Sequence, residues 1–154
     1  MASTSITPEI NYNVILEIDI SDAPHTEPEW ADMGIFTKNV AQALNEVIYQ
    51  ATYYADQGWG SSEVTGGQFT VTLTGDRKNG DPACDYIFDK ERQYSFGDAR
   101  KSKIRIRRGK EAIVWGVTLA NITDALGDAN QPNAVTVTIH SNGKPSFETI
   151  SDEM

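Results

Sequence analysis

The chain has 154 residues and a mass of 17.0 kDa, so a single folded domain is the default expectation. Its 13 Lys and Arg oppose 22 Asp and Glu, for a formal net charge of −9, which argues against sequence-independent binding of nucleic acid by the chain as a whole. A single cysteine excludes an internal disulfide and a cysteine-only metal site, and no apolar run approaches the ~20 residues that span a bilayer, so we expect no membrane insertion.

The N-terminal segment predicts a flexible start followed by one strand. We expect residues 1–10 to form a flexible arm. They lack the basic and apolar regions of a secretory signal, so we expect a protein made in a cytoplasm. Over residues 11–20, apolar and polar residues alternate, as is typical of a half-buried strand. A polar connection follows over 21–29, and then comes a small apolar cluster of Trp30, Met33, Ile35 and Phe36.

Residues 40–54 fit two patterns. Their Ala, Leu, Gln and Glu content favours a helix, whereas Val47, Tyr49, Ala51 and Tyr53 alternate and Asn45 interrupts the helical pattern. The pattern alone leaves both structures open. We expect a strand over 46–54, partly because of a resemblance described below.

Residues 56–67 predict a long loop. The segment DQGWGSSEVTGG holds four glycines, two serines and one threonine around Trp59, without apolar periodicity. A structureless connection of this length in a compact domain is usually functional or disordered. Trp59 then has two interpretations: the loop folds back so that Trp59 caps the core of its own subunit, or Trp59 docks onto an adjacent copy.

A strand, a turn and a helix are predicted next. Alternation is strict over residues 68–74, which are rich in strand-forming residues. The turn GDRKNGDP leads into a helix in which Asp81 is the N-cap, Pro82 is the first residue and Gly97 can end the helix. Cys84 falls in the first turn, where either a lowered thiol pKa or a small packing role is open, and we expect the packing role.

The remaining chain predicts three more strands. Residues 103–107 and 112–122 form a hairpin, a loop spans 123–133, and the last strand covers 134–140. We therefore expect a mainly β fold, an antiparallel β-sandwich or barrel with one α-helix. The domain would span residues 1–154, with flexible arms at about 1–10 and 145–154.

Charge is distributed unevenly along the sequence. Residues 77–110 carry 11 of the 13 Lys and Arg against 5 acids, a local charge of +6, whereas residues 1–76 sum to −10 and residues 111–154 to −5. If the basic segment forms one surface, it could meet the acidic remainder of a neighbouring copy and favour repeating contacts. Alternatively, these charges pair within one subunit or face water, where exposed pairs contribute little.

The sequence offers no catalytic constellation. His25 and His140 stand in unrelated settings, residues 56–63 lack the ligand spacing of a calcium loop, and the turn before the helix lacks the P-loop pattern. We therefore expect neither enzymatic activity nor a metal or other cofactor.

Several motifs resemble those of a known family. The block from Tyr53 to Phe88, YYADQGWGSSEVTGGQFTVTLTGDRKNGDPACDYIF, is similar to the signature of the tail tube (major tail) proteins of long-tailed, non-contractile bacteriophages. The likeness extends from about Ile10 to Phe147 and includes DISDAPHTEPEWADM, LNEVIYQ and NAVTVTIHSNGKP. It departs at IRIRRGKE, which is more basic than the resemblance leads us to expect.

The resemblance implies a structural virion protein of the tail, made in the host bacterial cytoplasm. Its subunits would form hexameric rings that stack coaxially, with loops and terminal arms joining the rings and sheet edges pairing between neighbours. Tail-tip, tape-measure and tail-terminator proteins would be partners, and DNA would pass through the tube transiently and without specificity. A defective prophage, a tail-like bacteriocin or a secretion tube stays open as the setting.

Candidate site residues fall into two groups. The expected subunit interface combines the central loop with the basic strand, through Asp56, Gly58, Trp59, Gly60, Glu63, Arg105, Arg107 and Arg108. The candidates for the lumen are the polar face of the following strand, Gln68, Thr70, Thr72 and Thr74. A bore lined by Lys103, Arg105 and Arg107 is disfavoured, because a basic wall would retain DNA.

A different class of function remains as an alternative. Tyr53, Tyr54 and Trp59 beside a loop also suit a monomeric β-sandwich that binds carbohydrate.

Overall fold

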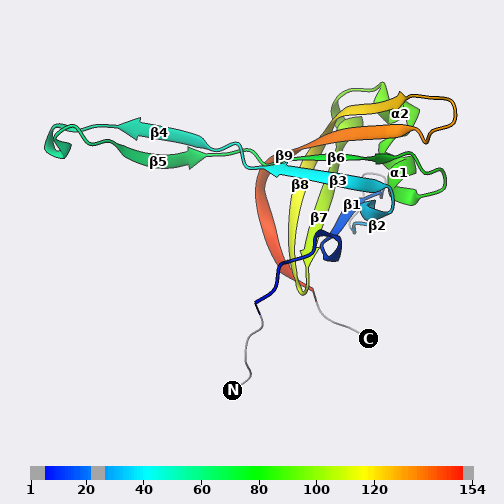
Figure 1. Cartoon of the computed structure of the whole chain (residues 1–154), viewed down its shortest axis with the longest axis horizontal. Coiled ribbons are helices and arrows are strands. Elements are labelled where there is room, and N and C mark those ends of the chain that lie inside the picture. The colour runs from blue at the N-terminus through cyan, green and yellow to red at the C-terminus, as the bar shows by residue number, and fades with distance from the viewer. Residues whose placement is uncertain (1–5, 22–26, 151–154) are drawn as a thin grey trace, which may run out of the picture.

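The computed structural model describes residues 6–21 and 27–150, and it is mainly β, as predicted (Figure 1). The expectations for residues 1–5, for His25 and for the last four residues lie outside the described part of the chain. The strands are β1 (Ile15–Asp19), β2 (Trp30–Asp32), β3 (Thr37–Ala43), β4 (Val47–Ala51), β5 (Ser61–Gly66), β6 (Thr70–Asp76), β7 (Lys101–Arg108), β8 (Glu111–Leu126) and β9 (Ala134–Thr149). The helices are α1 (Pro82–Ile87) and α2 (Lys90–Gln93), and short 3-10 turns cover Asn11–Asn13, Met33–Ile35, Tyr54–Asp56 and Gly97–Arg100.

Seven strands form one antiparallel sheet in the order β2-β1-β7-β8-β9-β6-β3, and β4 pairs only with β5. The sheet curls, and α1 and α2 lie together at the end of the molecule opposite the β4–β5 pair (Figure 1). No helix in the described part of the chain is long and apolar enough to cross a membrane.

The core follows from the alternation seen in the sequence. On β6 every second residue is buried, and its partners Val137 and Ile139 on β9 are buried as well. Phe69 stacks on Trp115 with ring centroids 4.2 Å apart. At Gly75 a β-carbon would come within 1.8 Å of the Phe36 carbonyl oxygen, so only glycine allows this close approach of the two backbones.

The predicted single helix is replaced by two short ones. Asp81 is the N-cap of α1, but Phe88 leaves the helical conformation and Asp89 becomes the N-cap of α2. This break lets both Ile87 and Phe88 face the core, where Phe88 contacts Phe36 edge to face with centroids 5.8 Å apart. Tyr94, just after α2, is exposed.

The predicted loop over 56–67 is wrong in its second half. Ser61–Gly66 forms β5, which pairs with β4, so the strand expected over 46–54 is realised as Val47–Ala51 within a β-hairpin. Glycine and serine give β5 little strand propensity of its own, and its backbone is ordered by hydrogen bonds to β4. Figure 1 shows this hairpin projecting far from the rest of the chain.

The C-terminal strands are longer than predicted. β8 and β9 each have 16 residues, and β8 absorbs the first part of the loop expected over 123–133. Residues 145–149, expected in a flexible arm, belong to β9 and pair with the start of β8. A register shift interrupts the β8–β9 ladder between Ala120 and Thr123, beside Asn121, whose backbone is left-handed. Because such a bulge breaks the alternation of buried and open residues, the alternation pattern alone underestimates the length of the strand.

Candidate assembly surfaces

Residues 44–68 form an exposed arm, and the remaining described residues form the body. On the arm, Ile48 pairs with Val64, yet the two side chains are 54 % and 60 % exposed. Tyr49, on the opposite face of the hairpin, is exposed too. A two-stranded hairpin is marginally stable alone in water, and paired apolar residues gain little while water reaches them. Both faces of the arm therefore expose apolar surface.

The tip of the arm, residues 53–60, is a compact turn that carries three aromatic side chains. The Tyr53 backbone N–H donates to Asp56 Oδ2 at 3.1 Å, and Gln57 adopts a left-handed conformation that reverses the chain. Tyr53, Tyr54 and Trp59 are all exposed, and Trp59 is 81 % exposed. Trp59 therefore does not cap the core of its own subunit.

Asn45 fixes the base of the arm. Its backbone is left-handed, and its Nδ2 donates to Gln68 O and to Thr70 Oγ1, each at 3.0 Å. The Gln68 N–H donates to Leu44 O at 2.9 Å, and a β-carbon on Gly67 would lie 3.2 Å from the same oxygen. These contacts bridge the end of the β3–β6 ladder to the start of the β4–β5 ladder, so they set the direction of the arm.

The basic strand β7 pairs within the subunit. Arg105 Nε donates to Glu17 Oε1 at 2.7 Å, Arg107 Nη1 lies 3.6 Å from Glu17 Oε2, and Arg105 also lies over the Trp30 ring, 4.7 Å from its centroid. Arg108 is more exposed, and its Nε lies 4.0 Å from Glu9 Oε2. Of the three arginines expected at an interface, Arg108 is therefore the one best placed to reach a partner.

Threonines gather on the sheet face opposite the core. Thr72 and Thr74 pair with Thr138 and Thr136 across the β6–β9 ladder, and Thr70 pairs with His140. Their side chains are partly exposed and uncharged, while Gln68 lies just before β6 at the base of the arm. Three of the four lumen candidates, Thr70, Thr72 and Thr74, thus belong to a wider polar face that β6 and β9 share, whereas Gln68 does not.

Two buried titratable groups lie at α1, away from these surfaces. Burial raises the pKa of the Asp81 carboxyl, an effect that the nearby backbone N–H groups of Cys84 and Ala83 only partly oppose, and within the described chain neither carboxylate oxygen has a hydrogen-bond partner. Cys84 is fully buried in the core, as the packing role requires, and this burial raises the pKa of its thiol. Over residues 6–21 and 27–150, no group of three or more His, Cys, Asp or Glu is arranged to hold a metal ion.

Sequence reasoning missed several exposed residues of the arm. Ile48 and Val64 were not singled out, Tyr49 was named only as part of a strand pattern, and the role of Asn45 at the base was not foreseen. The signal that could have found them is the pair of short alternating runs, IYQA and SEVT, on either side of a glycine-rich turn.

The architecture defines a class of protein: a curled antiparallel sheet with two short helices and a projecting β-hairpin. No protein-family model and no curated protein matches the sequence. Two solved structures are similar in fold: a chain from the tail of an empty gene transfer agent (GTA) particle with C6 symmetry, and a chain from the virion of a native GTA particle. Each has a TM-score of 0.68 and 14 % sequence identity, covering 92 % of this chain and 100 % of the other. The fold is therefore that of a GTA tail chain, in agreement with the resemblance to phage tail proteins.

Proposed function

We propose that the chain is a structural subunit of a phage-type tail, without enzymatic activity. Its copies assemble into hexameric rings, and the rings stack into a tube that conducts DNA to the host. The observation that carries the proposal is the arm, whose apolar residues on both faces and at the tip are exposed in the single chain. The C6 symmetry of the similar GTA tail supports a six-membered ring.

Open sheet edges support the same proposal. β3 and β2 are the last strands at the two ends of the seven-stranded sheet, and β3 has an exposed outer edge. Edge strands with free backbone groups tend to pair with another chain. Pairing between neighbours would close the rings, and arms would connect one ring to the next.

The threonine face on β6 and β9 is the candidate wall of the bore. Uncharged side chains at Thr72, Thr74, Thr136 and Thr138 would let a DNA duplex slide, because retention of phosphates requires Lys or Arg. Tail-tip, tape-measure and terminator proteins would bind the two ends and the interior of such a tube. A free arm loses conformational entropy on docking, which would disfavour polymerisation until a tail-tip complex nucleates it.

Negative-stain electron microscopy with light scattering across a wide concentration range tests the proposal. We expect rings or tubes of uniform width. A chain that stays monomeric at high concentration, and also in the presence of a tail-tip nucleator, would contradict it.

A monomeric carbohydrate-binding protein is the second candidate. It is favoured by the exposed Tyr53, Tyr54 and Trp59, since aromatic rings stack on sugars. These side chains lie at a turn beyond the body, away from the enclosing walls that ligand sites usually have. Titration with cell-wall glycans separates the two candidates: a saturable change in tryptophan fluorescence of the monomer would support sugar binding.

A further inference from the structure

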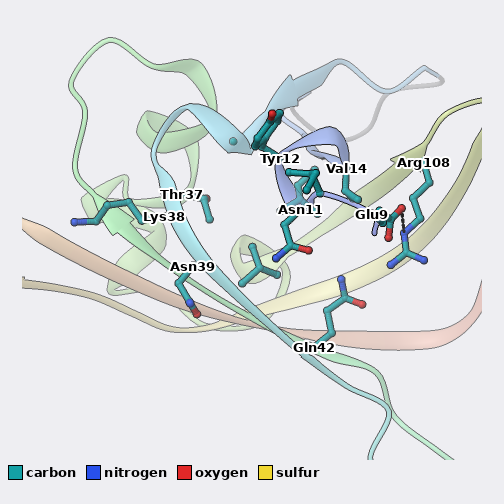
Figure 2. Close-up of a pocket in the computed structure, with 13 residues that line it drawn as sticks. Glu9, Asn11, Tyr12, Val14, Thr37, Lys38, Asn39, Gln42 and Arg108 are labelled. Atoms are coloured by element: carbon teal, nitrogen blue, oxygen red, sulfur yellow. Dashed lines mark ion pairs between the residues drawn. The ribbon is translucent and has the colours of Figure 1, made fainter. Parts of the chain in front are cut away.

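A groove of about 830 Å³ lies between β3 and the N-terminal segment of the body. Figure 2 shows β3 on one side, with Asn39 and Gln42, and the segment carrying Asn11 and Val14 on the other. Lys38 and Arg108 stand toward opposite ends of the groove, and the side chains of Asn11, Gln42 and Arg108 point into the space between the two walls.

Within residues 6–21 and 27–150, this groove leaves part of the core face uncovered. Val40 pairs with Leu73 and Gln42 with Val71, and directly paired residues share one face of a sheet, so both side chains lie on the core face. Leu73 and Val71 are buried, yet Val40 is 38 % exposed and Gln42 is exposed. Ile10, which also lines the groove, is exposed as well. Val40 and Ile10 therefore give a largely polar groove an exposed apolar floor, and exposed apolar patches rimmed by polar residues are typical of interaction sites.

The arm of the same chain cannot cover this floor. It leaves the body at the end of β3 and points away from the other strands (Figure 1). β4 separates Tyr54 from Gln42, and its five residues, at about 3.3 Å per residue, span roughly 17 Å. The contacts of Asn45 hold the arm in this direction. A tip that enters the groove therefore comes from a second copy.

Charge favours the arm as the occupant. The arm carries Glu46, Asp56 and Glu63 and has neither Lys nor Arg. The groove offers Lys38 and Arg108, whose partners Asp76 and Glu9 lie in exposed ion pairs at 3.2 and 4.0 Å. Exposed pairs of this kind are weak, so either cation can exchange its partner for a carboxylate of the arm.

We infer that the groove between β3 and the N-terminal segment is the docking site for the arm tip of another copy. Trp59 and Tyr54 would cover Val40 and Ile10. The side-chain amides of Gln42 and Asn11 would form hydrogen bonds with polar atoms of the tip. Since each copy then has one donor tip and one acceptor groove, the contact is heterologous and repeats from copy to copy. The inference rests on the proposed function and names the surface that receives the arm.

Disulfide trapping between two variants of the full chain, each with one introduced cysteine, tests the inference. Tyr54→Cys places a thiol on the tip, Gln42→Cys places one in the groove, and the native Cys84 is buried. Leu126→Cys is the matched control, because Leu126 is an exposed residue of the body at the end of β8. Variants are mixed in pairs and oxidised mildly, and linked heterodimers are measured on non-reducing gels, while electron microscopy records rings and tubes in the same samples.

We expect Tyr54→Cys to link to Gln42→Cys at least about tenfold faster than to Leu126→Cys, because docking raises the local thiol concentration into the millimolar range. Linked heterodimers without tubes would support the docking site and contradict the tube. Tubes in which Tyr54→Cys links equally to both partners, or not to Gln42→Cys, would overturn the docking site alone. Monomers without linkage at every concentration, and also in the presence of a tail-tip nucleator, would overturn both.

Discussion

The body and the arm differ in what their paired apolar residues contact. In the body, Leu73 pairs with Val137 across β6 and β9, and both side chains are fully buried. In the arm, Ile48 pairs with Val64 in the same antiparallel manner, yet more than half of each side chain is exposed. The comparison teaches that strand pairing alone does not make a core. The body buries its apolar residues within one chain, whereas those of the arm are available to a partner.

The largest expected effect is on the free energy of unfolding, when an aliphatic residue of the body is truncated and compared with a truncated aliphatic residue of the arm. Leu73→Ala should lower the free energy of unfolding by about 2–5 kcal/mol, because it leaves a cavity in a packed core. Val64→Ala should lower it by less than about 0.5 kcal/mol, since its side chain is exposed. Denaturant unfolding of dilute protein measures both values. A loss above about 2 kcal/mol for Val64→Ala would mean that the arm packs on its own body.

Trp59→Ala should act on assembly while leaving the monomer unchanged. A tryptophan buried at an interface contributes about 2 kcal/mol or more, so the concentration at which rings or tubes form should rise roughly thirtyfold. Tyr94→Ala is the matched control, because Tyr94 is an exposed aromatic residue of the body next to α2. Light scattering against concentration measures the effect. If both variants raised the assembly concentration equally, the arm would contribute no more to assembly than the body surface at Tyr94.

Asn45 variants should change the direction of the arm. Asn45→Gly keeps the left-handed backbone but loses the hydrogen bonds to Gln68 and Thr70, each worth about 1 kcal/mol, and Asn45→Ala adds backbone strain. We expect the distance distribution between spin labels on Tyr54→Cys and Leu126→Cys to broaden in the order parent, Asn45→Gly, Asn45→Ala. A distribution that stays narrow in both variants would show that other contacts hold the arm.

Alternation in the sequence predicted part of the body. Residues 68–74 match β6 to within two positions, and residues 134–140 match the start of β9, where buried and open positions alternate. The rest of β9, and the strands β2 and β3, were not predicted. The partner of Arg105 could not be predicted in this way. Glu17 lies 88 positions away, and the two meet only because β1 pairs with β7.

The arm was predicted in composition but not in shape. Trp59 was found because it stands between two glycines on a polar segment, whereas β5 was taken for a loop because its pairing with β4 is not encoded in its own residues. The groove could not be found at all, since Val40 and Gln42 look like ordinary strand residues until the curl of the sheet leaves them uncovered. The break between α1 and α2 was also hidden, because it depends on Phe88 meeting Phe36.

The smallest expected effect concerns Asp81, deep in the body. Because burial raises the pKa of this carboxyl in the folded chain, the folded state holds the proton more tightly than the unfolded state. Its contribution to stability is therefore fully present below the ordinary pKa of aspartate and is lost as the pH rises through the raised value. Asp81→Asn keeps an N-cap side chain without the charge. The gain in thermal stability of this variant over the parent should therefore be larger at about pH 7 than at about pH 4. Thermal unfolding at the two pH values, with the exposed Asp89→Asn as the control at the N-cap of α2, measures the difference. If the stability difference between Asp81→Asn and the parent were equal at both pH values, the folded chain would stabilise the Asp81 carboxylate as well as water does.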